Sequence, residues 1–263
     1  MNAVARFETL TRLGFAARGL LYLTVGYLAI EAGRATGTSG ALRSLAEGGI
    51  GRVALAVIAL GLLAYGTWRL AEAIVDIEGH GSDTKGRLVR AGHALSGIAH
   101  LLLAVLAVRL ALGSAGESSG GGATGTTSWV LALPGGTVLV RLIGIGLLLA
   151  GLAQIAQAVR LRFLRQLDAQ AARQEWVKWT GRLGYIARGA VFVLVGIFFW
   201  RAGASANAHD AGGMGEALAS LPGWWQTAVA AGLALFGIFS IVQAIYRRIT
   251  DPHVVERLKA RVA

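Results

Sequence analysis

The sequence predicts an all-α integral membrane protein in which six transmembrane helices form three repeated hairpins. The first observation is composition: of 263 residues, 55% are hydrophobic and only 15% are charged, whereas soluble domains carry about 25% charged residues. The second is that the charges are confined to short stretches between six long apolar runs. The third is that similar strings of residues recur along the chain. Together these indicate a polytopic membrane protein.

Two further features of the composition exclude classes of function. The chain has no cysteine, which excludes disulfides, thiol redox chemistry and thiolate metal sites. Its net charge of +11 does not require a nucleic-acid partner, because basic residues on the cytoplasmic side of a membrane account for it. We also expect no cleavable signal peptide, since the first apolar run follows Arg6 and Arg12 and is too long for a signal sequence.

Each apolar run is long enough to span a bilayer, which takes about 20 residues as a helix. In chain order the runs are 13–33, 52–75, 91–112, 137–160, 183–203 and 225–247. The third loop contains a glycine- and serine-rich stretch at 113–122 that is typical of a flexible tether.

The lysines and arginines predict the orientation. Most of the 25 lie in the N-terminal arm, in the loops at 76–90 and 161–182, and in the C-terminal tail. Cytoplasmic loops of membrane proteins carry an excess of these residues, so we expect both termini in the cytoplasm. The basic segment at 162–179 is partly amphipathic, and we expect it to lie on anionic lipid headgroups.

The odd-numbered runs open with one motif and the even-numbered runs share another. The opening string RLGFAARG at 12–19 returns as RLGYIARG at 182–189 and, in altered form, as RAGHALSG at 90–97. The second motif, Gly-x4-Gly-x5-(Glu/Gln)-Ala, begins at Gly61, Gly146 and Gly232. Segments 41–45 and 217–221 also resemble each other, which predicts a short amphipathic segment in the outer loops.

The repeat divides the chain into three hairpin units: 1–80, 81–168, and 169–263 with its basic cytoplasmic tail. Because each unit has an even number of spans, all three insert in the same orientation. Parallel repeats are related by an axis along the membrane normal, so the pattern predicts a pseudo-threefold bundle.

These motifs and their triplication resemble a bacterial membrane family described as domain of unknown function 1206. The resemblance covers nearly the whole chain. It implies a six-span, three-hairpin protein of the bacterial cytoplasmic (plasma) membrane and brings no established activity. The middle unit departs from the pattern, because Ser96 replaces arginine, and His93 and His100 replace aromatic residues.

Glycines spaced along one helix face allow close helix packing in lipid. We expect this role for Gly19, Gly26, Gly61, Gly146, Gly189, Gly196 and Gly232.

Polar residues within the runs form a candidate intramembrane layer: Arg18, Glu72, His93, Ser96, His100, Gln157, Arg188 and Gln243. Ionisable residues inside a membrane usually pair and often mark function. An Arg18–Glu72 contact within the first hairpin is geometrically possible. Two interpretations stay open, namely that the layer fixes the register of the helices or that it binds an ion or ligand.

His93 and His100 share a face of the third span. A proton relay or a haem ligand is conceivable there, although histidines that hydrogen-bond across helices are commoner. We assign no metal and no cofactor.

Searches for a phosphate-binding loop, a zinc motif and a nucleophile elbow find nothing, so we do not expect an enzyme. Two functions follow. The first is a structural or accessory membrane protein that binds lipid or a partner complex. The alternative is a small transporter or channel, with a proton or solute path lined by Glu72, His93, His100 and Arg188.

Overall fold

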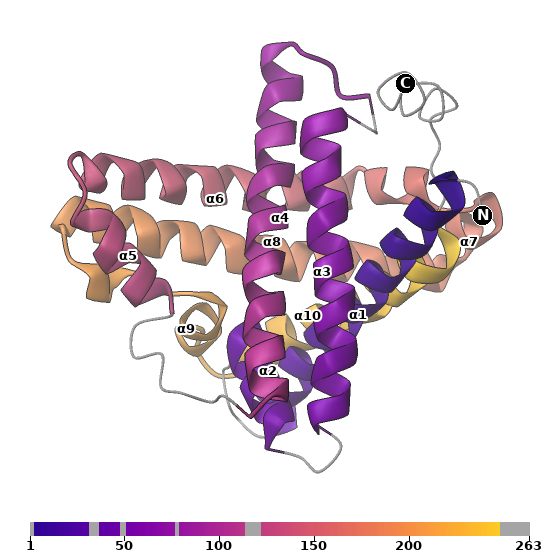
Figure 1. Ribbon diagram of the computed structural model, residues 1–263, viewed down its shortest axis with the longest axis horizontal. Helices are drawn as coiled ribbons and strands as arrows, with labels where there is room; N and C mark the ends of the chain where they lie inside the picture. The colour runs from indigo at the N-terminus through magenta and orange to yellow at the C-terminus, as the bar shows by residue number, and fades with distance from the viewer. Residues whose placement is uncertain (1–2, 32–36, 48–50, 77–78, 114–121, 248–263) are drawn as a thin grey trace.

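The computed structural model describes residues 3–31, 37–47, 51–76, 79–113 and 122–247, and these residues are almost entirely helical (Figure 1). The long helices are α1 (Ala3–Glu31), α3 (Gly51–Val75), α4 (Thr84–Ala111), α6 (Gly136–Val159), α8 (Glu175–Ser205) and α10 (Trp224–Tyr246). The short ones are α2 (Thr38–Ala46), α5 (Ala123–Leu131), α7 (Ala169–Arg173) and α9 (Met214–Ala219), with 3₁₀ turns η1 (Arg162–Gln166) and η2 (Ala208–Asp210).

Within the described residues, six helices are long and apolar enough to cross a membrane. This confirms the six predicted runs to within a few residues at most of their ends. The main differences are that α1, α4 and α8 begin well before the runs at 13, 91 and 183. Polar residues continue all three helices, and the start of α4 is capped by the Asp83 carboxylate, which accepts a hydrogen bond from the Gly86 N–H at 2.9 Å. The predicted tether and the C-terminal tail lie largely outside the described residues.

The short helices α2, α5 and α9 occupy the loop between the two long helices of each unit. In Figure 1 α5 and α9 lie towards the left and α2 towards the bottom, whereas the α3–α4 connection lies at the top and α7 at the right. In α2 and α9 the equivalent pairs Ala41–Leu42 and Ala217–Leu218 are fully buried. The predicted amphipathic segments are therefore short helices that press one apolar edge onto the bundle.

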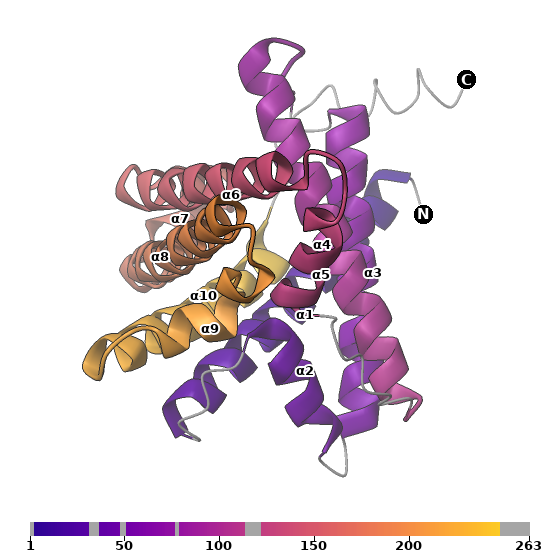
Figure 2. The same ribbon diagram turned by 90° about the vertical axis from the view of Figure 1, so that its left-hand side faces the viewer.

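The long helices associate mainly across unit boundaries. The three most extensive pairings are α3 with α4, α6 with α8, and α1 with α10; each pair is antiparallel, and the three pairs fan out from one another (Figures 1 and 2). Further contacts join α1 to α3 and α8 to α10. The described helices therefore form an arc in the order α4–α3–α1–α10–α8–α6.

Residues at equivalent repeat positions make each of the three pairings between units. We call the first long helix of each unit (α1, α4 or α8) its odd helix and the second (α3, α6 or α10) its even helix, after the order of the spans. At each pairing a glycine of the odd helix lies against a glycine of the even helix, and a Cβ on the first would come within 2.8–3.0 Å of the carbonyl oxygen of the second. The facing pairs are Gly19 with Gly237, Gly97 with Gly66, and Gly189 with Gly151. We call these three contacts the inter-unit seams. Gly26 and Gly196 extend two of them, because a Cβ on either would meet the neighbouring helix backbone.

Contacts inside a unit repeat only twice. A Cβ on Gly61 would lie 2.2 Å from the Ala17 Cβ, and a Cβ on Gly232 would lie 2.4 Å from the Ala187 Cβ. The prediction that Gly146 packs a helix is wrong, since a Cβ there would meet nothing within 4 Å. The reason is that α4 and α6 are not among the main pairings of the described helices.

We call the region between α4 and α6 the open seam, defined by Gly92, Leu95, Gly146 and Ala150. Gly92 stands at the repeat position of Gly14, and a Cβ on Gly92 would also meet nothing within 4 Å. By contrast, a Cβ on Gly14 would lie 2.6 Å from the Tyr65 Cβ in the closed first unit. The two helices at the ends of the arc, α4 and α6, are both helices of the middle unit, and this unit is therefore the one that is not closed.

The basic segment before α8 is anchored in the bundle rather than lying wholly on its surface. The Phe163 side chain of η1 is fully buried. Its ring stacks on Tyr185 at 5.3 Å and meets Phe239 edge-on at 5.0 Å between centroids. Arg162 and Arg165 stay exposed on either side.

Candidate functional site

Each inter-unit seam contains one buried or half-buried arginine near the level of the seam glycines. Arg18 of α1 faces α10, and Arg188 of α8 faces α6 at the same repeat position. The third arginine is Arg69 of α3, on the even helix, and the equivalent position of its partner helix α4 holds Ser96. At the seam between α3 and α4 the arginine therefore lies on the opposite helix of the pair from Arg18 and Arg188. The serine is exchanged as well, because Ser240 of the third unit occupies the repeat position of Arg69.

Arg18 is almost fully buried, with 3% of its surface exposed. Its guanidinium donates to the Gln243 Oε1 at 2.7 Å, the Tyr65 hydroxyl at 2.8 Å and the Ser240 Oγ at 3.2 Å. It also lies 4.9 Å from the centre of the Phe236 ring, within the range of a cation–π interaction. All three nitrogens are therefore satisfied by neutral acceptors on α3 and α10.

Arg188 makes an equivalent but more exposed contact. It is half-buried and donates to the Tyr22 hydroxyl at 2.9 Å and to the Gln154 Oε1 of α6. Its guanidinium lies 4.4 Å from the centre of the Phe192 ring. These acceptors are again neutral.

Glu72 is the carboxylate of the layer and is 1% exposed. Its Oε2 accepts a hydrogen bond from Arg69 at 2.6 Å, and its Oε1 lies 4.0 Å from a guanidinium nitrogen of Arg247. Arg69 also donates to the Tyr65 hydroxyl at 3.0 Å, so this hydroxyl links Arg18 to Arg69. Among the described residues Arg18 forms no ion pair with Glu72, which corrects the contact considered possible from the sequence.

The two histidines of α4 have different surroundings. The His93 Nδ1 lies 3.3 Å from the Glu72 Oε2, and its ring meets the His80 ring edge-on at 5.2 Å. His80 in turn lies 3.7 Å from the Asp76 carboxylate. This series of groups leads from the buried Glu72 towards the partly exposed α3–α4 connection.

His100 belongs to the centre of the bundle instead. Its Nδ1 is 2.7 Å from the Ser96 carbonyl oxygen one turn earlier, and its ring packs 4.5 Å from that of Tyr65. Gln157 is half-buried and lies outside the hydrogen-bonded network. The structure therefore brings together Arg18, Glu72, His93 and Gln243, while Arg188 and His100 lie in neighbouring contacts and Gln157 stands apart.

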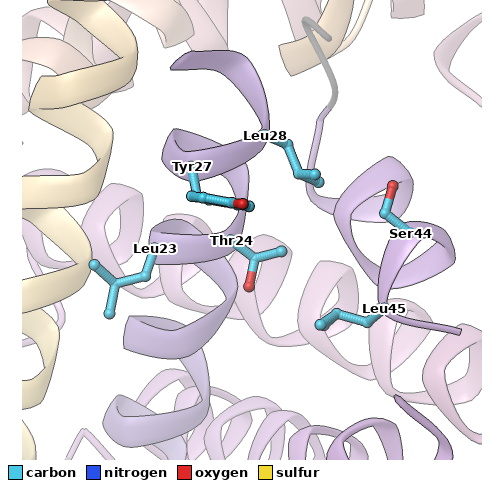
Figure 3. Close-up of a pocket in the computed structure, with 6 residues that line it drawn as sticks. All are labelled: Leu23, Thr24, Tyr27, Leu28, Ser44 and Leu45. Atoms are coloured by element: carbon cyan, nitrogen blue, oxygen red, sulfur yellow. The ribbon is translucent and has the colours of Figure 1, made fainter. Parts of the chain in front are cut away.

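Two hollows in the described part of the protein are lined by residues outside the layer. One hollow, of about 370 Å³, lies between α1 and α2 (Figure 3). Its lining is mainly apolar: Leu23, Thr24, Tyr27, Leu28, Ser44 and Leu45. The other, of about 140 Å³, is lined by Arg12, Asp168, Ile245, Tyr246 and Arg247. Within the described ranges, no three histidine or acidic side chains lie close enough to hold a metal ion.

Sequence reasoning missed five members of the network: Tyr22, Tyr65, Arg69, Gln154 and Ser240. A signal was present for three of them. Arg69, Gln154 and Ser240 occupy one position of the repeated second motif, three residues before the Glu/Gln position. A position that is polar in all three copies of an apolar helix indicates a shared contact.

The fold and site define a class of protein. Six apolar helices, three repeats and a polar layer across the helix seams indicate a multi-pass membrane protein. The family described as "Domain of Unknown Function (DUF1206)" matches residues 13–76, 91–160 and 183–247, one segment per unit, and the chain belongs to this family.

A similar protein is the "Uncharacterized protein YxxB" of Bacillus subtilis (strain 168), which is 33% identical over 254 residues. The match covers 91% of this chain and 90% of that protein. No solved structure matches the chain.

Proposed function

We propose that this protein is a non-enzymatic, structural or accessory membrane protein in which the polar layer fixes the register of the helices. The main support for this proposal is the bonding of Arg18. Its guanidinium is buried and uses all of its nitrogens on side chains of α3 and α10. A group committed in this way holds helices together and is not free to bind a passing solute.

The location in the membrane and the symmetry of the bundle are part of this proposal. Basic residues at the end formed by α7 and the α3–α4 connection support a bacterial cytoplasmic membrane location with both termini in the cytoplasm. Exposed Arg162 and Arg165 beside the anchored Phe163 support contact with anionic headgroups or with a partner complex. The three equivalent glycine seams support a pseudo-threefold axis along the membrane normal.

The alternative function, proton transport, is favoured by one observation. Glu72, His93, His80 and Asp76 form a succession of titratable groups from the buried layer towards the α3–α4 connection. His100 and Arg188, which the sequence placed on the same path, have other partners.

Vesicles that contain the purified protein distinguish the two functions. We expect proton flux, measured with an enclosed pH-sensitive dye, to equal that of empty vesicles for both the wild type and Glu72→Gln. The variant should fold, with a loss of about 1–2 kcal/mol in unfolding free energy, because glutamine keeps an acceptor but loses the charge-assisted bond from Arg69. Gln157 and Gln243 already occupy this position in the other units. A flux that the variant abolishes would contradict the accessory function, whereas a stoichiometric partner that co-purifies in mild detergent would support it.

A further inference from the structure

The open seam differs from its two closed equivalents by a missing side chain as well as by missing contacts. In the closed units the even helix packs an aromatic ring on the odd helix. The Tyr65 ring meets the Phe15 ring at 5.4 Å, and the Phe236 ring meets the Tyr185 ring at 5.2 Å, between centroids. In the middle unit the same position holds Ala150, which is half-buried. An aromatic ring is therefore absent where it would fill the space between the two helices.

We propose that the open seam binds one anionic phospholipid, whose phosphate is held by Arg188. This inference rests on the accessory function proposed above and names the lipid and the place where it binds. The repeat pattern alone requires no ligand; the charge and the position of Arg188 indicate one.

The charge of the layer is unbalanced. Arg18, Arg69 and Arg188 contribute three guanidinium groups, whereas Glu72 is the carboxylate that the described layer contains, and Arg69 is bonded to it. A cation away from water is costly unless it is paired. Arg188 has only neutral hydrogen-bond partners, Tyr22 and Gln154, and its third guanidinium nitrogen donates to none of the described residues. An anion would compensate this charge.

The position of Arg188 connects that charge to the open seam. Its partner Gln154 lies on α6, one helical turn after Ala150, so the guanidinium reaches the helix that forms one wall of the seam. Arg188 follows Trp179 by nine positions in α8, which corresponds to about 14 Å along the helix axis. A headgroup bound there must enter between the helices, which distinguishes this site from the basic surface around Arg162.

The chemistry of the walls favours a phospholipid over other occupants. The two helices that border the seam expose apolar side chains, with Leu95 and Leu102 of α4 and Leu149 of α6 at 70%, 66% and 61% exposure, which suits an occupant with apolar length as well as an anionic end. A second copy of this chain would bring a second Arg188 and a further net charge of +11. Closure of the seam by α4 and α6 themselves would add no anion.

The test uses the full-length protein purified from membranes in mild detergent, with bound phosphatidylglycerol measured by native mass spectrometry. We expect about one tightly retained molecule per wild-type chain, and phosphatidylcholine should not replace it. Arg188→Gln should weaken retention about tenfold or more, because a charge-assisted contact is lost. Arg141→Gln is the matched control, since Arg141 belongs to the same helix pair but donates to the Gly203 carbonyl oxygen at 3.0 Å; it should retain the lipid.

A second variant keeps the proposal testable if Arg188→Gln folds poorly. Ala150→Phe restores the residue of the closed third unit and leaves every charge in place, so it should fold and should exclude the lipid. Retention that neither variant changes would overturn the seam site and leave the accessory function standing, whereas flux in the vesicle assay would overturn the function itself.

The cysteine-free chain allows a direct check of the occupant. In native membranes Gly92→Cys with Ala150→Cys should form no disulfide if lipid separates the helices. A disulfide within one chain would show that the seam closes, and a disulfide between chains would show a second copy; either result would overturn the proposal.

Discussion

The first and third units of this protein close in the same way, whereas the middle unit does not close. In the closed units a glycine of the odd helix meets an aromatic residue of the even helix, Gly14 with Tyr65 and Gly184 with Phe236. In the middle unit the glycine is kept, as Gly92, but the aromatic residue is replaced by Ala150. The glycines approach main-chain and Cβ atoms of these residues, and what the middle unit lacks is the ring that packs on Phe15 or Tyr185 of the odd helix. Small residues permit close approach but do not fill the space between helices.

The seams between units behave differently. All three copies keep the glycines of these seams, and all three seams are formed. The seam between the first and middle units also keeps one arginine, although it lies on the even helix of the first unit, as Arg69, and not on the odd helix α4. Pairing between units is therefore the constant part of the fold, and closure within a unit is the variable part.

The largest expected effect distinguishes equivalent glycines in the closed and open seams. Gly61→Leu should lower the unfolding free energy by about 3 kcal/mol, because even a Cβ would lie 2.2 Å from the Ala17 Cβ. Gly146→Leu should change it by about 0.5 kcal/mol or less, since that position is open. Denaturation of both variants in mixed micelles measures the difference, and equal losses would show that α4 and α6 pack in solution.

The next effect compares the two equivalent arginines. Arg18→Met should cost about 2–3 kcal/mol, because it removes three buried hydrogen bonds and leaves the Gln243 acceptor without its donor. Arg188→Met should cost about 1–2 kcal/mol, since Arg188 is half-buried and makes two such bonds, to Tyr22 and Gln154. The same unfolding measurement applies, and the reverse order would contradict the assignment of Arg18 to the closed part of the bundle.

A smaller effect tests the exchange of arginine and serine across the seam between α3 and α4. Arg69→Ser should cost about 2 kcal/mol, because Glu72 loses its bonded cation. Adding Ser96→Arg should recover about 1 kcal/mol by restoring a guanidinium from the other side, as Arg18 does opposite Ser240. A double-mutant cycle measures the coupling, and strictly additive losses would show that the two positions are not equivalent.

The smallest effect concerns the α3–α4 connection, outside the spans. Burial of the Asp76 carboxylate raises its pKa, but hydrogen bonds from the backbone N–H of Gly81 and His80, with nearby Arg90, outweigh burial and hold the pKa below its ordinary value. Ionised Asp76 therefore stabilises the fold above the ordinary carboxyl pKa, and this contribution is lost as the pH falls through the lowered value. Asp76→Asn should cost about 0.5–1 kcal/mol at pH 7, and this difference should shrink as the pH falls through the lowered pKa. A difference that does not shrink on acidification would rule out the carboxylate as the cause.

The six helices, the three units and the positions of most seam glycines could be predicted before the fold was known. These follow from local patterns, namely long apolar runs, charge placement and recurring glycines, and each pattern depends on residues close together in the chain. The polar members of the layer could also be found, because a charged residue in an apolar run stands out wherever it is.

Which helices meet could not be predicted, because it depends on contacts between residues far apart in the chain. Arg18 bonds to Gln243, 225 residues away, and not to Glu72 in its own unit, because the helices of different units pair more closely than those of one unit. The open seam could not be predicted either, since Gly146 occupies the same motif position as Gly61 and Gly232. Its surroundings differ because Ala150 stands where the other two units have an aromatic residue. Repeated sequence predicts which residues are equivalent, but the bulk and charge of the side chains opposite them decide whether equivalent contacts form.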